Sequence, residues 1–142
     1  MKTYKSKISL SKNDRGIWDL DTIKGCESGL KLNKNGCYGD CYAAKNARIY
    51  GIDFSKSIRR SFESETHRAE IVRLINRADM PFIRIGCSGD PSEDWQHTID
   101  ILTQLSKNVQ LKLFDEQPKK IVIITRHWYN LTDTQLIDIS KF

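Results

Sequence analysis

The chain has 142 residues, of which 39% are hydrophobic and 29% charged, a composition typical of a single globular domain. This length is enough for a hydrophobic core but falls short of the ~250 residues of a complete (β/α)8 barrel. The net charge of +5 is modest and spread along the chain, so it permits nucleic-acid binding without requiring it. We expect a cytoplasmic protein without membrane contact, because no apolar run approaches a membrane span or follows the charged N-terminus as in a signal peptide.

The N-terminal third contains one short strand and a long loop. Residues 1–16 form a polar segment rich in lysine and serine. Residues 17–23 alternate apolar and polar side chains with a period of two, which predicts a strand. Residues 25–41 hold glycines among polar residues without any periodicity, so we expect a functional loop there. Helix-forming residues follow and predict a helix from Tyr42 that stops at Gly51.

The middle of the chain changes to a helical period. Apolar residues at helical spacing predict a helix over 56–78. A short apolar run predicts a strand over 82–87, and the next apolar face predicts a helix over 93–107 with Ser92 as its cap. Val109–Phe114 fits either a strand or an extension of that helix.

The C-terminal part contains a strand and a helix. The β-branched run over residues 120–125 is typical of a strand buried on both faces. Thr132 and Asp133 can start a last helix over 133–140.

Strands and helices therefore alternate along the chain, an order that predicts a mainly parallel sheet with right-handed crossovers. The predicted fold class is α/β, in the form of a partial (β/α) barrel of about three βα units. We treat residues 1–142 as one domain, a half barrel or part of a larger one. Residues 121–124 would form an open sheet edge, which a second copy of the chain or another partner would cover.

Three of the four cysteines, Cys26, Cys37 and Cys41, lie within sixteen residues and are called the loop cysteines here. In a chain without a signal peptide such clustering favours metal binding over disulfides. Three thiolates leave one position open on a tetrahedral ion or on a four-iron cluster. Zinc would need a fourth ligand, for which the candidates are Cys87, His67, His97 and His127. Cys87 itself follows an apolar run and is expected in the core.

The predicted strands end in polar, glycine-containing segments. Functional residues of parallel α/β sheets gather past the carboxyl ends of the strands. The first strand leads to Cys26, and the next two lead to five further candidate residues, Ser88, Gly89, Asp90, Thr125 and Arg126. The sequence therefore predicts a pocket at this edge of the sheet.

These segments are similar to a known family. The loop cysteines followed by Tyr42-Ala43 resemble the cluster loop of the radical S-adenosylmethionine (radical SAM) superfamily, in particular phage and bacterial radical-SAM-like proteins with a Cys…Cys…Cys-Tyr-Ala loop. Residues 84–90 are similar to their Ser-Gly-Asp strand end, and residues 123–126 resemble the Thr-Lys/Arg end of the following strand. The resemblance covers about residues 17–130, although the first gap between cysteines is longer than in the superfamily's commonest motif.

The resemblance implies a cofactor and an activity. The loop cysteines would hold a [4Fe-4S] cluster whose fourth iron binds S-adenosylmethionine. Ser88, Gly89 and Asp90 would bind the methionine amino group. Thr125 and Arg126 would approach the methionine carboxylate or the substrate. The implied activity is reductive cleavage of S-adenosylmethionine, which starts radical chemistry on an unknown substrate.

An alternative is a non-enzymatic module, stabilised by zinc or a cluster, that binds a protein or a nucleic acid. The short chain and its basic charge favour this alternative.

Overall fold

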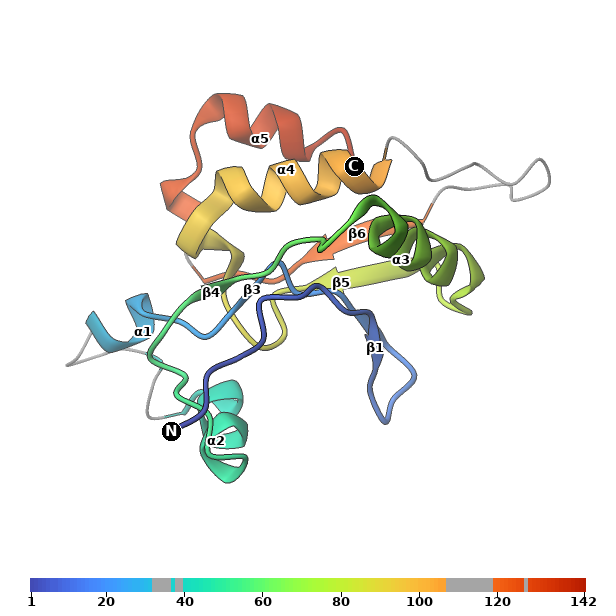
Figure 1. The fold of residues 1–142 in the computed structure, drawn as a ribbon. Helices are drawn as coiled ribbons and strands as arrows, with labels where there is room; N and C mark the ends of the chain where they lie inside the picture. Colours follow the sequence, from blue (N-terminus) through green and yellow to red (C-terminus); the bar gives the residue numbers. More distant parts are fainter. Residues whose placement is uncertain (32–36, 38–39, 107–118, 127) are drawn as a thin grey trace.

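A computed structural model describes residues 1–31, 37, 40–106, 119–126 and 128–142. These residues form a mixed α/β fold around an open sheet (Figure 1). The ambiguous segment Val109–Phe114 and the zinc candidate His127 lie outside the described residues. Within the described ranges, no helix has the length and apolar character needed to cross a membrane.

The main sheet has the strand order β1-β2-β5-β6. Its strands are β1 (Ser11–Lys12), β2 (Trp18–Asp19), β5 (Phe82–Ile85) and β6 (Lys120–Ile123). β1 runs antiparallel to β2, whereas β2, β5 and β6 are parallel, so the prediction of a mainly parallel sheet is confirmed. A separate two-stranded antiparallel sheet pairs β3 (Ile23–Lys24) with β4 (Ile58–Arg59).

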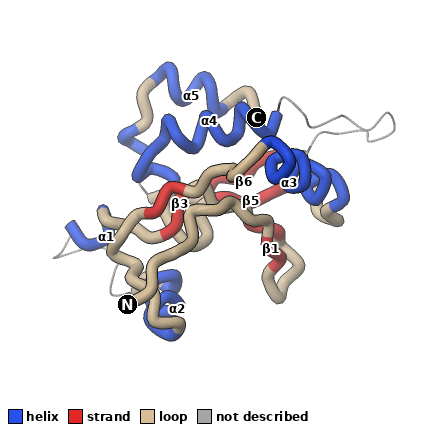
Figure 2. Tube along the Cα trace, in the orientation of Figure 1, coloured by secondary structure: helices blue, strands red, loops and turns tan. Residues whose placement is uncertain are grey.

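The helices lie around the outside of the main sheet, and long loops connect the elements of the N-terminal half (Figure 2). The α-helices are α1 (Ser28–Lys31), α2 (Tyr42–Ile49), α3 (Glu65–Arg77), α4 (Trp95–Ser106) and α5 (Asp133–Ile139). Two 3-10 turns, η1 (Pro91–Asp94) and η2 (Trp128–Asn130), precede α4 and α5. The predicted helix from Tyr42 to Gly51 and the predicted C-terminal helix are confirmed to within two residues.

The main core lies between the sheet and the pair α3 and α4. Ile71 and Ile75 of α3 share one buried cluster with Ile83 of β5 and Ile101 of α4. Because side chains alternate along a strand, Arg84 points to the opposite face of the sheet. We call this opposite face, which carries Asp19, Arg84 and Val122, the second face.

The predicted strand over residues 17–23 is wrong in its extent. Only Trp18–Asp19 pairs in the main sheet, and Ile23–Lys24 pairs in the small sheet instead. Between them the buried carboxylate of Asp21 accepts hydrogen bonds from backbone N–H groups at residues 86–88. These bonds hold the chain across the end of β5 rather than alongside it, which ends the pairing.

The predicted helix over 56–78 begins only at Glu65. The hydroxyl of Ser64 accepts a hydrogen bond from the backbone N–H of His67 and caps the helix at this point. Upstream, Ile58–Arg59 is extended because it pairs with β3. A tertiary partner therefore overrides the helical pattern in this segment.

The predicted cap at Ser92 is also wrong. The carboxylate of Asp90 accepts a hydrogen bond from the backbone N–H of Ser92 (2.9 Å) and caps η1, and α4 starts at Trp95. Pro91 occupies the first position of the turn, where its missing N–H costs nothing.

The C-terminal strand is not buried on both faces. Val122 and Ile124 are 40% and 45% exposed, whereas the alternating residues Ile121 and Ile123 are half-buried. β6 ends the order of described strands, and the exposed side chain of Val122 leaves its second face partly open to solvent.

The carboxylate of Asp79 makes stability depend on acid pH. It accepts hydrogen bonds from the Lys12 ammonium and from Trp18 Nε1, each 2.8 Å long, and these bonds lower the pKa of Asp79 to about 2. A depressed folded-state pKa stabilises the protein above the unfolded pKa of 3.8, and this stabilisation is lost as the pH falls towards 2. We expect Asp79→Asn to lower the free energy of unfolding at pH 7 but not at about pH 2, as measured by urea denaturation at both values. Equal effects at both values would contradict the assignment.

Candidate functional site

A pocket of about 130 Å³ lies beside the start of α2, where β5 and β6 end. The loop cysteines line it together with Gly89, Asp90, Thr125 and Arg126. Tyr42, Cys87 and Phe54 complete much of the wall. Of the predicted site residues only Ser88 does not line the pocket. The structure therefore brings residues from three distant parts of the sequence together at the predicted edge of the sheet.

Backbone contacts draw the first two strand ends together. The backbone N–H of Gly25 donates to the carbonyl oxygen of Ser88 (2.9 Å), and Gly25 pairs with Gly89 in a parallel bridge. A side chain at Gly89 would overlap the carbonyl group of Ile23. Gly89 is therefore needed for close backbone approach, so its place in the pocket does not depend on a ligand.

Asp21 is the residue of the site that sequence reasoning missed. Its carboxylate is 3% exposed. Oδ1 accepts from the backbone N–H groups of Gly86 (3.0 Å) and Cys87 (2.8 Å), and Oδ2 accepts from that of Ser88 (2.9 Å). Asp21 thus shapes the turn that carries the second strand end into the pocket. The available signal was a second acid two residues after Asp19, at the end of a predicted strand.

Cys26 is the most buried loop cysteine. Its Sγ accepts a hydrogen bond from the backbone N–H of Gly29 (3.3 Å), and its thiol donates to Oε1 of Glu93 (3.5 Å). Burial raises the pKa of Cys26 to about 12, the Gly29 amide opposes that rise and the Glu93 carboxylate adds to it. The thiol is therefore protonated at neutral pH until a bound cation displaces the proton.

Cys37 and Cys41 are half-buried and complete the cysteine wall of the pocket. Cys41 is the N-cap residue of α2, as predicted, and its carbonyl oxygen accepts from the backbone N–H of Lys45 (3.1 Å). Among the described residues no three His, Cys, Asp or Glu side chains converge on the position of a single metal ion. A four-iron cluster places each thiolate on a separate iron, so thiols spread around one cavity fit its donor set.

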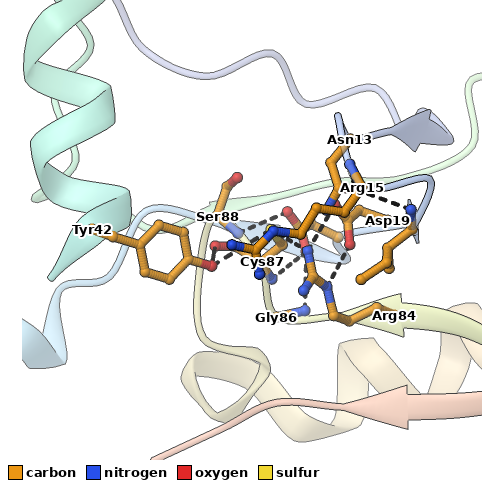
Figure 3. A network of polar contacts seen from close by, with 10 residues as sticks. Asn13, Arg15, Asp19, Tyr42, Arg84, Gly86, Cys87 and Ser88 are labelled. Carbon is orange, nitrogen blue, oxygen red and sulfur yellow. Dashed lines mark hydrogen bonds and ion pairs between the residues drawn. The ribbon is translucent and has the colours of Figure 1, made fainter.

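Cys87 is not a core residue as predicted, because a polar network surrounds it on the second face (Figure 3). Its Sγ accepts from Nη2 of Arg84 (3.2 Å), and the Tyr42 hydroxyl lies 3.5 Å from Sγ and 2.5 Å from the Cys87 carbonyl oxygen. The Arg84 guanidinium donates to both carboxylate oxygens of Asp19, at 2.6 Å and 3.1 Å. Burial raises the pKa of Cys87, and its contacts with Tyr42 and Arg84 oppose the rise. The network joins the start of α2 to the sheet.

Asp90 ties the ends of β5 and β6 together. Oδ1 accepts from the Thr125 hydroxyl (2.6 Å) as well as from Ser92 N–H, and Oδ2 accepts from the backbone N–H of Arg126 (3.1 Å). Asp90 therefore has a structural role at the turn before Pro91, and it also lines the pocket. A carboxylate has about four acceptor sites, so it can take one further donor from a ligand.

The two described histidines are bonded elsewhere. Nδ1 of His67 accepts from the backbone N–H of Glu63 (3.1 Å), and Nε2 of His97 lies 2.9 Å from the carbonyl oxygen of Arg60. Neither lines the pocket. Among the described candidates for a fourth zinc ligand, only Cys87 lies in the wall with the loop cysteines.

Comparison of the chain with family models, with curated proteins and with solved structures finds no match. The function is therefore inferred from the residues of the pocket and their contacts.

Proposed function

We propose that this chain holds a [4Fe-4S] cluster on its loop cysteines and binds S-adenosylmethionine beside it, as radical SAM enzymes do. The observation that carries this proposal is one pocket lined by Cys26, Cys37 and Cys41 and by Asp90 and Arg126 from two strand ends. A bound cluster supplies the electron for reductive cleavage of S-adenosylmethionine. We interpret the open sheet as a partial (β/α) barrel of about three units, with the pocket at its carboxyl rim.

The residues of the chain have separate tasks in this proposal. The Gly29 amide, which donates to Cys26 Sγ, stabilises thiolate character there. Asp90 retains acceptor capacity for the methionine ammonium group, and the Arg126 guanidinium suits the methionine carboxylate. The Ser88 backbone is already bonded to Asp21 and Gly25, so only its hydroxyl is available to a ligand.

Metal analysis after anaerobic reconstitution tests the proposal. We expect about four irons per chain and a visible absorption that bleaches on reduction. The single variants Cys26→Ala, Cys37→Ala and Cys41→Ala should each lose most of the iron, whereas Cys87→Ala, a matched cysteine variant, should retain it. Calorimetry should show S-adenosylmethionine binding that Asp90→Ala weakens. A chain that takes up no iron, or whose loop-cysteine variants all retain it, would contradict the proposal.

A zinc-stabilised binding module is the second candidate. It is favoured by one observation, which is that Cys87 lines the same pocket as the loop cysteines and supplies a fourth thiol there. The thiols would have to move together to bind zinc, because no three of the described ligand side chains converge on a single ion. The same analysis separates the two candidates. One zinc per chain that is lost in Cys87→Ala would favour the module.

A further inference from the structure

The charged side chains of α2 differ in sign from those of α4 and α5. α2 carries Lys45 and Arg48 and has no acidic residue. α4 and α5 carry acidic residues and no lysine or arginine. Figure 1 shows α2 on one side of the main sheet and α4 and α5 on the other. Of these three helices, α2 is therefore the one that a polyanion would approach.

The exposed surface of α2 combines cations with large apolar groups. We define the α2 patch as Lys2, Lys45, Arg48, Ile49 and Tyr50. Ile49 and Tyr50 are 76% and 72% exposed. Lys2 is included because it is exposed and its backbone N–H donates to the carbonyl oxygen of Gly51 (3.0 Å), which places its main chain beside the end of α2.

The opposite side of α2 explains why these long side chains face solvent. Ala43, Ala44 and Ala47 are buried there in one cluster with Cys26 and Phe54. The small side chains of these alanines let α2 pack closely against Cys26 and Phe54. The surface of α2 is thus fixed relative to the pocket.

The α2 patch leads to the mouth of the pocket. Tyr42, the first residue of α2, lines the pocket. Tyr42, Lys45 and Ile49 are three and four residues apart and share one face of the helix. A polymer that lies along α2 would therefore reach the pocket at Tyr42.

The chemistry of the patch favours a single-stranded nucleic acid over an acidic protein. Its nearest described ion pair, Lys45 with Asp40, is 4.0 Å long between two highly exposed groups, and such a pair leaves the lysine available to a ligand. Cations and an exposed aromatic ring on the same helix and its C-cap match a sugar–phosphate backbone whose bases stack on the ring. Acidic side chains would satisfy the cations but would leave Tyr50 without a stacking partner.

We propose that the α2 patch binds single-stranded nucleic acid and that the substrate presented to the pocket is a nucleotide within that strand. The second part, a nucleotide as the substrate, rests on the proposed function of the pocket. Binding to the patch itself needs no cluster.

Fluorescence anisotropy with a labelled single-stranded oligonucleotide of about 20 nucleotides tests the proposal across a series of salt concentrations. Three phosphate contacts, by Lys2, Lys45 and Arg48, predict that log K falls against log salt with a slope of about −2. The double variant Lys45→Gln/Arg48→Gln should weaken binding and reduce the slope by about 1.4. Tyr50→Ala should weaken binding about five-fold or more, through lost stacking, and leave the slope unchanged.

A matched variant on α3 controls for a non-specific attraction between the oligonucleotide and positive charges elsewhere on the protein. Arg73 and Arg77 are exposed, and Arg73→Gln/Arg77→Gln removes the same charge four residues apart. We expect this variant to bind as the wild type does. Equal losses in both double variants would overturn the proposal. A Tyr50→Ala variant of unchanged affinity, with polyglutamate competing as well as the oligonucleotide, would also overturn it in favour of an acidic protein partner.

Measurements on metal-free and reconstituted protein keep this proposal separate from the proposed function. Binding by a chain that takes up no iron would contradict the cluster and support the patch. Iron uptake without oligonucleotide binding would contradict the patch alone. Circular dichroism of each variant checks that it is folded before its affinity is compared.

Discussion

Replacing Asp21 by alanine is expected to lower the free energy of unfolding by about 3–9 kcal/mol, because three part-buried N–H groups lose their acceptor at about 1–3 kcal/mol each. These groups belong to Gly86, Cys87 and Ser88, and the Asp21 carboxylate is their acceptor. A domain of this kind has about 5–15 kcal/mol of stability, so the variant should unfold at low urea or fail to accumulate as folded protein. Urea denaturation followed by circular dichroism measures the change.

Asp21→Asn tests a smaller loss of hydrogen bonding, because asparagine has nearly the same shape as aspartate. An asparagine oxygen can still accept from Gly86 and Cys87, but the amide nitrogen that replaces Oδ2 faces the Ser88 N–H, donor against donor. We therefore expect this variant to lose about 1–3 kcal/mol, less than the alanine variant does. Asp100→Ala, at an exposed position on α4, should change stability by less than about 0.5 kcal/mol. If both Asp21 variants behaved like Asp100→Ala, the hydrogen bonds at this turn would be assigned wrongly.

The proximity of the polar residues at the strand ends could be predicted, because it follows from the topology of a parallel sheet. Parallel strands end at the same edge of a sheet, so polar residues after β5 and β6 had to lie near one another. Asp90 and Arg126 are 36 residues apart, and a hydrogen bond now joins them. The position of Cys41 at the start of a helix could also be predicted, because the alanine-containing segment that follows it favours a helix.

The burial of Asp21 could not be predicted from its neighbours in the sequence. Its partners lie 65 to 67 residues further along the chain, and only the complete fold brings them to its carboxylate. Alternation along a strand places acidic residues on a solvated face by default. Cys87 was misjudged for a related reason. Its apolar neighbours indicated a core position, but Arg84 and Tyr42 meet it on the second face.

The error at residues 56–64 shows how a short strand competes with a helical pattern. Apolar residues at helical spacing continue upstream of Ser64, yet Ile58 and Arg59 pair with Lys24 and Ile23. This pairing orders the segment directly before Gly25 and Cys26, so it helps to position the cysteine loop. In this region a local propensity of a few tenths of a kcal/mol per residue loses to tertiary contacts.

Replacing Gly86 by alanine is expected to lower the free energy of unfolding by about 2–5 kcal/mol, because positive φ costs about 1–2 kcal/mol and overpacking about 1–3 kcal/mol. Gly86 has a φ of +96°, and a Cβ there would overlap the carbonyl oxygen of Ile124 and lie 3.2 Å from Cδ of Pro91. The strands cannot simply separate to make room, because the backbone N–H of Ile124 donates to the Ile85 carbonyl oxygen (2.8 Å).

Gly51→Ala separates the cost of positive φ from the cost of overpacking. Gly51 also has a positive φ, of +66°, but a Cβ there would meet no atom within 4 Å. This variant should therefore lose only about 1–2 kcal/mol, which leaves the difference from Gly86→Ala as the cost of the clash with β6. Thr125 follows Ile124 directly and lines the pocket, so the same clash should weaken S-adenosylmethionine binding while Gly51→Ala leaves it intact. Equal stability losses in the two variants would mean that β6 does not approach Gly86 closely, and the pocket would then lose its third strand end.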